Sequence, residues 1–219
     1  MLDDFAGTIQ TDGYPVYLSY AKDRPDLVLA ACWAHARRYF YEAVEQTPGL
    51  ANWMLHQIGL LYQVEAPLRE TQAGATLRQR ERACASGMII KRIHRVLQAK
   101  RRAHRPELLI TKAINYTLGL WKQLECFLED GRLEIDNNLV ENAIRPTAIG
   151  KTNYLFYGAP ESGQRSAIIY TIIENCKRLG VPPQEYLHDV LSRLPAMTNQ
   201  QTHELTPANW AAQREVQVA

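Results

Sequence analysis

The sequence predicts an α/β protein that is predominantly helical. Two short runs near its beginning, residues 8–12 and residues 27–32, have strand-like composition, and the second is continuously apolar. Residues 50–130, in contrast, place their apolar side chains at helical spacing, with no internal repeat and no low-complexity linker. We therefore expect a small sheet accompanied by many helices.

The composition is that of an ordinary globular protein, because the 219 residues are 46% hydrophobic and 22% charged, with a net charge of +2. The chain is long enough for one large domain or two small ones. Its four cysteines are scattered without a C-x-x-C pair, which argues against a disulfide framework and a cysteine-rich zinc site. We find no signal peptide and no apolar run of about 18 residues, so a cytoplasmic protein without a membrane partner is the default expectation.

The first β-prone run leads directly into Gly13, which is a turn signal. Asp12 is therefore expected at the C-terminal end of a strand, where open α/β sheets often place ligand-binding groups. A turn-forming Asp beside a glycine explains the same pattern without any ligand.

The second run, residues 27–32, leads into a predicted helix that extends to about Gln46, before a Thr-Pro-Gly sequence. The Cys32-x-x-His35 spacing at its start is compatible with metal binding. A structural zinc site needs four ligands, however, and no second pair is visible. A packed or hydrogen-bonded Cys–His pair is the simpler interpretation.

Residues 50–130 predict three helices. The first is expected to be broken by Pro67. The second covers roughly Thr76–Lys100 and the third about Pro106–Glu129, each with apolar residues along one side.

Charge is distributed in two blocks of opposite sign. Between Arg69 and Arg105, 11 Lys and Arg residues stand against two Glu, whereas between Glu125 and Glu141 six acidic residues stand against one Arg. A basic block followed by an acidic one suits a protein that binds a polyanion and holds a cation. Two solvated helix faces explain the same distribution equally well.

The acidic block culminates in the segment Arg132–Lys151. Crowded acidic side chains of this kind usually either face water or bind a cation. Asn138 is a good helix N-cap, and Glu141 is placed to complete a capping box; a catalytic role for Glu141 is the alternative. Pro146 disfavours helical geometry at Arg145, so this helix is expected to be short or bent.

Beyond this segment, residues 153–158 form an aromatic, β-prone run that ends at a turn glycine. The next helix, about Gln164–Leu179, is interpreted as a core helix because an apolar stripe follows one of its faces, composed of Ile168, Ile172, Cys176 and Leu179. A short helix over Gln184–Leu194 follows. The tail from Pro195 is polar and expected to be loose.

Residues 113–146 resemble the C-terminal catalytic region of insertion-sequence-66-type transposases, which are DDE transposases with a ribonuclease H-like core. Further motifs of that family occur in the family's order: Q-T-D-G-Y at residues 10–14, C-W-A-H-x-R-R at residues 32–38 and P-x-x-Y-L at residues 183–187. The resemblance covers residues 8–195, but only the last part of the family's length.

This resemblance implies a partial ribonuclease H-like core whose first strands are missing, with a large helical insertion. The core would occupy residues 1–46 and 131–195, the insertion residues 47–130, and a polar tail residues 196–219. The separation of Asp12 from Glu141 is too long for a plain core of this kind but suits one with such an insertion.

The resemblance also implies that Asp12 and Glu141 are the second and last members of a metal-binding carboxylate triad that uses Mg²⁺ or Mn²⁺. The family's first Asp, in an Asp-Glu-Thr context, does not precede Asp12. Asp3 and Asp4 lie too close to it to leave room for two intervening strands. We therefore expect that the chain begins partway through a larger fold and is inactive by itself. An exposed strand edge makes a homo-oligomer the expected state.

The activity implied is metal-dependent phosphodiester cleavage at a transposon end and strand transfer into target DNA, so the expected partner is DNA. Candidate phosphate contacts are basic side chains near the family's active site, along the second helix of the insertion and after the acidic segment: His35, Arg37, Arg38, Arg92, Arg95, Arg145 and Lys151. Two other function classes stay open, a non-catalytic DNA-binding or regulatory remnant and a helical interaction module.

Overall fold

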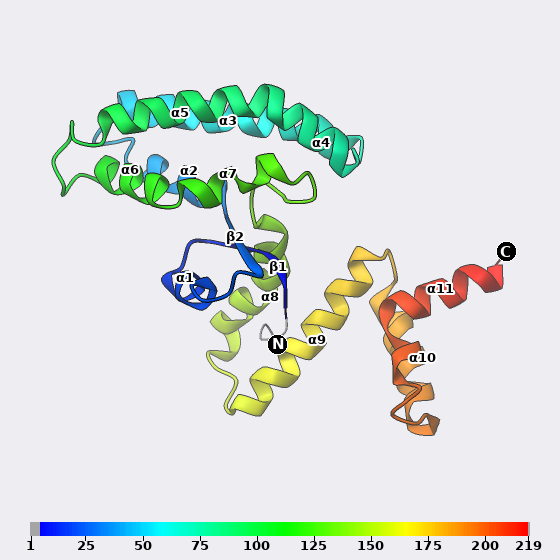
Figure 1. Ribbon diagram of the computed structural model, residues 1–219. Coiled ribbons are helices and arrows are strands. Elements are labelled where there is room, and N and C mark those ends of the chain that lie inside the picture. Colours follow the sequence, from blue (N-terminus) through cyan, green and yellow to red (C-terminus); the bar gives the residue numbers. More distant parts are fainter. Residues whose placement is uncertain (1–4, 219) are drawn as a thin grey trace. The chain divides into compact units, whose positions relative to one another are not determined.

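The computed structural model describes residues 5–218 of the chain, with side chains up to Arg214. Asp3 and Asp4, the poor substitutes for the first triad residue, lie outside the described residues. The chain divides into two compact units, Met1–Leu139 and Val140–Ala219, and we describe each by itself. The described residues are mostly helical and include one small parallel sheet, as the sequence predicted (Figure 1).

The sheet of the first unit consists of β1 (Gly7–Thr11) and β2 (Leu27–Ala31). They pair in parallel, from Gly7 opposite Leu27 to Thr11 opposite Ala31. Parallel neighbours need a crossover connection, and here it contains α1 (Pro15–Ala21), a helix that the sequence analysis missed. Both predicted strands are confirmed, and β1 ends one residue before Asp12.

Helices form the main core of the first unit. Figure 1 shows α3 and α5 side by side above α2, α6 and α7, and α7 packs against β2. The helices are α2 (Trp33–Glu42), α3 (Pro48–Glu70), α4 (Ala75–Glu81), α5 (Gly87–Lys100), α6 (Leu109–Gly119) and α7 (Trp121–Glu129). Large fully buried side chains fill the space between the layers, among them Trp33, Phe40, Met54, Ile58, Ile93 and Leu124.

The helix boundaries in this unit differ from the prediction in three places. Pro67 lies inside α3 without ending it, because buried Leu61 and Leu68 hold its last turns in the core. The predicted second helix is a continuous run in which the π-helical turn η1 (Arg82–Ser86) joins α4 to α5. The predicted third helix is divided into α6 and α7 at Leu120, whose ψ of 19° departs from helical geometry.

The helix α8 (Asn138–Tyr154) is longer than predicted, because it continues through Pro146. Asn138 is its first helical residue, so the predicted N-cap is displaced by one position. The β-prone run at residues 153–158 does not form a strand. Tyr154 instead ends α8; its hydroxyl donates to Thr147 O at 3.2 Å and lies 3.0 Å from the hydroxyl of Tyr157, from which it can accept. Leu155 and Phe156 are 69% and 72% exposed, so the β-propensity of this run is not matched by burial against a sheet.

The second unit also contains α9 (Pro160–Arg178), α10 (Pro183–Arg193) and α11 (Pro207–Val218), with short 3₁₀ turns η2 (Leu194–Ala196) and η3 (Thr202–Leu205). The core-helix interpretation of α9 was wrong for half of its stripe: Ile168 is 54% and Leu179 47% exposed, whereas Cys176 is fully buried and Ile172 packs against the same core.

The tail after Pro195 is ordered rather than loose. Trp210 of α11 is buried against Tyr186, with the rings 5.6 Å apart and edge to face, and its Nε1–H donates to Asp189 at 2.8 Å. The Tyr186 hydroxyl donates to Leu205 O at 2.6 Å. One buried tryptophan anchors this otherwise polar segment, which its composition alone does not indicate. Among residues 5–218, no helix combines the length and apolar character needed to cross a membrane.

Candidate functional site

Asp12 lies immediately beyond β1 with an exposed side chain. Its Oδ1 accepts the backbone N–H of Tyr14 at 3.0 Å, and Gly13 between them has a φ of +84°, which favours glycine. On the other side, the hydroxyl of Tyr116 donates to the backbone oxygen of Asp12 at 2.6 Å. The backbone of this residue is therefore fixed, while its carboxylate remains accessible to solvent.

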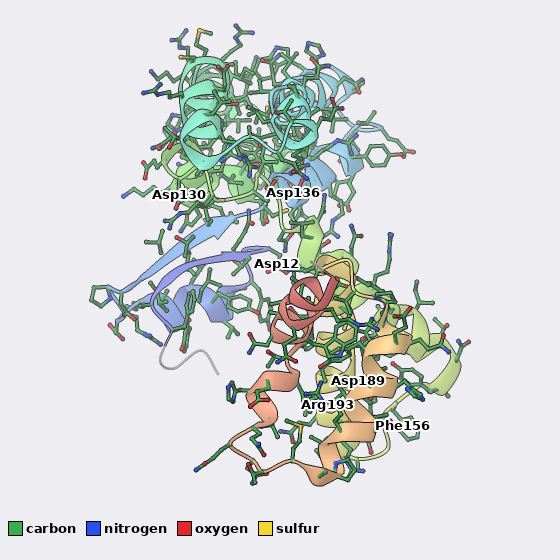
Figure 2. All side chains as sticks on the ribbon, turned by 90° about the vertical axis from the view of Figure 1, so that its right-hand side faces the viewer. Asp12, Asp130, Asp136, Phe156, Asp189 and Arg193 are labelled. Atoms are coloured by element: carbon green, nitrogen blue, oxygen red, sulfur yellow. The ribbon has the colours of Figure 1, made fainter. Side chains whose placement is uncertain are left out.

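The segment of residues 134–137 is bound at the carboxyl ends of both strands, the same end at which Asp12 lies. Gln10 in β1 donates its Nε2–H to Glu134 O at 2.8 Å, and Trp33, which follows β2, donates its N–H to Ile135 O at 3.1 Å. Ile135 is fully buried and Asp136 is 3% exposed. Figure 2 labels Asp12 and Asp136, and the hydrogen bonds above show why the acidic segment is held at this edge.

Asp136 connects this segment to α8. Its Oδ1 accepts the backbone N–H of Asn138 at 3.1 Å, so a carboxylate stands at the positive end of the helix dipole. Its Oδ2 lies 3.7 Å from the guanidinium of Arg69. Glu141 lies in the first turn of α8 with an exposed side chain. Asp12 belongs to the first unit and Glu141 to the second.

The Cys32–His35 pair lies beside this segment. Cys32 is fully buried, and burial raises the pKa of its thiol even though backbone N–H groups, including that of Asn137, stabilise the thiolate. His35 is half-buried in the first turn of α2. In the part of the chain that the structure describes, no three His, Cys, Asp or Glu side chains group closely enough to hold a metal ion.

Sequence reasoning missed a set of ion pairs above the acidic segment. Glu134 is contacted by Arg69 and Arg78, and Arg78 also reaches the buried Glu65. These residues are far apart in the chain, so no local pattern pairs them. The only sequence signal was the adjacency of a basic and an acidic block.

Comparison with known proteins identifies the family of this chain. Residues 1–165 match the family described as "Transposase IS66 family", and residues 171–208 match the "IS66 C-terminal element". This chain belongs to the IS66 transposase family. The two matches together cover both structural units of this family member.

Curated relatives of this IS66 chain come from Sinorhizobium fredii (strain NBRC 101917 / NGR234). It is 33% identical over 226 residues to the uncharacterized protein y4jD, covering 100% of this chain and 44% of y4jD. It is 34% identical over 202 residues to the uncharacterized protein y4qI, covering 88% of this chain and 37% of y4qI. The chain thus spans less than half the length of these relatives. No solved structure matches it.

The candidate phosphate contacts of this IS66 chain lie at three places. Arg37 and Arg38 are exposed on α2, next to Tyr39, which stacks on Tyr116 at 4.3 Å. Burial raises the pKa of Tyr116, and the charge of Asp12 raises it further, whereas Arg38 lowers it. Arg38 therefore acts electrostatically on the tyrosine that holds the backbone of Asp12.

The other basic candidates lie on two different helices. Arg92 and Arg95 are exposed on α5, on the side away from its buried residues Ile90, Ile93 and Leu97. Arg145 and Lys151 are exposed on α8, in the second unit.

Proposed function

We propose that this chain forms the catalytic part of an IS66 transposase, which cleaves phosphodiester bonds at a transposon end and joins the freed 3′-hydroxyl to target DNA. The observation that carries the proposal is the anchoring of residues 134–137 at the strand ends beside Asp12. Glu141 follows this segment within the first turn of α8. The parallel pairing of β1 and β2 also supports their assignment to a partial ribonuclease H-like core.

Asp12 and Glu141 would hold Mg²⁺ or Mn²⁺, because carboxylate oxygens are the hard ligands that these ions prefer. Asp12 fits this role since its carboxylate is exposed on a fixed backbone. A bound Mg²⁺ would activate the attacking oxygen and stabilise the leaving oxygen. Arg38, which acts on Tyr116 together with Asp12, and its neighbour Arg37 would orient the phosphate group, because a guanidinium binds phosphate with two parallel hydrogen bonds.

The 219-residue chain is expected to show no cleavage of duplex DNA by itself. It supplies two carboxylates, whereas the family resemblance implies three, and metal affinity falls steeply when a ligand is missing. The measurement is Mg²⁺-dependent nicking of a duplex that carries a transposon end, compared with a protein of the relatives' length. Nicking by the 219-residue chain that disappears in Glu141→Gln would contradict this expectation.

A second candidate function, DNA binding without catalysis, is favoured by the exposed arginines of α5. Replacing Arg92 and Arg95 by Gln should weaken binding to all duplexes alike and reduce the slope of log K against log salt by about 1 for each phosphate that is no longer neutralised. The measurement is a fluorescence-anisotropy titration at several salt concentrations. Arg132→Gln is the matched control, since Arg132 is equally charged and highly exposed but lies outside α5. An unchanged slope in the α5 variant would exclude this surface as the DNA-binding face.

A further inference from the structure

A series of ion pairs connects the interior of the first unit to the segment that precedes α8. It begins at Glu65 in α3, whose side chain is fully buried. Arg82, which is also fully buried, donates Nε–H and Nη2–H to the two carboxylate oxygens of Glu65, each at 2.7 Å. The remaining nitrogen, Nη1, donates to Phe127 O at 2.9 Å and to Asp130 O at 3.2 Å. Arg82 thereby ties α3 to the end of α7.

The series continues outward through two more arginines. Arg78 contacts Glu65 at 3.2 Å and Glu134 at 2.8 Å, so it bridges the buried carboxylate and the acidic segment. Arg69 donates Nε–H and Nη2–H to the other oxygen of Glu134, at 3.0 and 2.8 Å, and its Nη2 lies 3.7 Å from Asp136. The carboxylate of Glu134 is thus hydrogen-bonded from the helical layer, and that of Asp136 lies within ion-pair distance of it.

The local structure explains why these arginines share one face. Arg78 and Arg82 are four residues apart in a continuous helical run, so their side chains project to the same side. The π-helical turn that begins at Arg82 turns Arg82 and Ser86 into the interior. Burying these charges is costly unless every partner is well placed. Such an arrangement is suited to fixing geometry rather than to adding stability.

The last link is made by Asp136. One of its oxygens faces Arg69, and the other accepts the N–H of Asn138, the first residue of α8. Glu134 and Ile135, just before it, are bound through their backbone oxygens to the two strand regions. The start of α8 is therefore fixed from two directions, by the sheet and by the arginines.

We propose that Arg69 and Arg78 are positioning residues for α8. They hold Glu134 and Asp136 in place, and through Asp136 they fix the start of the helix from which Glu141 extends. This inference rests on the proposed metal-binding role of Glu141, and it assigns to the helical layer a task in the reaction that is separate from DNA binding.

The test uses hydrogen exchange of the backbone amides in the 219-residue chain. Replacing Arg69 by Gln should raise the exchange rate of the hydrogen-bonded amides of Asn137 and Asn138 about tenfold, because two charge-assisted hydrogen bonds to the segment are removed while the core pairs remain. Exchange in α2 and in the middle of α3 should not change, which shows that the variant is folded. Arg132→Gln is the control. This substitution also removes a positive charge and an ion pair, but the ion pair is with Asp130 and not with Glu134 or Asp136.

A conservative variant distinguishes the effect of the hydrogen bonds from Arg69 to Glu134 from the effect of its positive charge. Arg69→Lys keeps the charge but cannot donate two hydrogen bonds from a planar group, so it should restore less than half of the lost protection. In the full-length transposase, Arg69→Gln should lower kcat for DNA cleavage without changing KM, since Arg69 acts on the geometry of α8 rather than on DNA binding.

Three outcomes would overturn the proposal: unchanged exchange at Asn137 and Asn138 in Arg69→Gln, an equal change in Arg132→Gln, or full protection in Arg69→Lys. Failure of the proposed function has a different signature. Cleavage would then survive in Glu141→Gln, while the exchange result for Arg69→Gln would still stand.

Discussion

Replacing Glu141 by Gln should reduce the proposed Mg²⁺-dependent DNA cleavage, measured in a protein of the relatives' length, more than about a hundredfold. Removal of groups that merely orient metal ligands already costs about 10- to 100-fold, so loss of a ligand itself is expected to exceed that range. The amide keeps the size of the side chain but loses its negative charge, which a hard cation such as Mg²⁺ requires. The measurement is the initial rate of strand cleavage at saturating Mg²⁺ on a duplex with a transposon end.

Glu161→Gln provides a matched control for this experiment. Glu161 is also an exposed glutamate in the first turn of a helix, α9, so the two substitutions make the same chemical change in the same local setting. It should leave cleavage unchanged. Asp12→Asn should resemble Glu141→Gln, and neither variant should weaken binding of DNA in the absence of metal. Cleavage at the normal rate in Glu141→Gln would remove this residue from the site.

Replacing Glu65 by Gln should lower the free energy of unfolding of the first unit by about 3–5 kcal/mol, because it leaves the guanidinium of Arg82 buried without its counter-charge. The hydrogen bonds from Arg82 at 2.7 Å show how closely the two groups are matched. Urea unfolding followed by tryptophan fluorescence measures the effect. In a Trp210→Phe background, the other tryptophans, Trp33, Trp53 and Trp121, all report on the first unit.

The same pair predicts how stability depends on pH. Burial alone would raise the pKa of Glu65, but the hydrogen bonds and charge of Arg82 and Arg78 outweigh it and lower the pKa below its usual value of 4.5. A carboxylate whose pKa is lowered on folding stabilises the folded state at pH values above its unfolded-state pKa. This contribution is lost as the pH falls through the lower pKa that the group has in the folded state. The wild type should therefore lose stability in acid, below about pH 4.5, more steeply than Glu65→Gln.

Arg132→Gln is the control for both measurements. Its partner Asp130 also has a lowered pKa, of about 2, because Arg132 donates hydrogen bonds to it. The side chain of Arg132 is 81% exposed, however, so solvent screens the pair. The unfolding midpoint should hardly move. A Glu65→Gln variant as stable as the control would show that the buried pair contributes little to the fold.

Local patterns in the sequence predicted the features that depend only on nearby residues, namely strands and the exposed faces of helices. The β-prone runs before Asp12 and Cys32 are strands, and the apolar spacing in residues 87–100 places Arg92 and Arg95 on an exposed face, because both features follow from backbone periodicity. Proline rules were less reliable. Pro67 lies within α3, where buried neighbours offset one missing N–H; Pro146 lies within α8, whose described residues include no buried side chain that explains it.

Long-range pairing is what the sequence analysis could not provide. Both interpretations of the basic block, a surface for a polyanion and a solvated helix face, leave its arginines exposed, yet Arg69, Arg78 and Arg82 bind Glu65 and Glu134 within the same unit. Counting charges cannot distinguish an arginine that faces solvent from one that neutralises a carboxylate 17 or 65 residues away. The metal-binding roles of Asp12 and Glu141, and the phosphate contacts, remain predictions.

The burial of Trp210 against Tyr186 sets the order in which the chain completes its folding during synthesis. The core of the second unit contains Trp210, so it closes only after translation has passed that residue. At usual elongation rates the ribosome needs roughly 4 to 16 s to add the second unit after the first. The nascent chain therefore has time to fold its sheet and helical layers, and to fix the start of α8, before the C-terminal helices assemble.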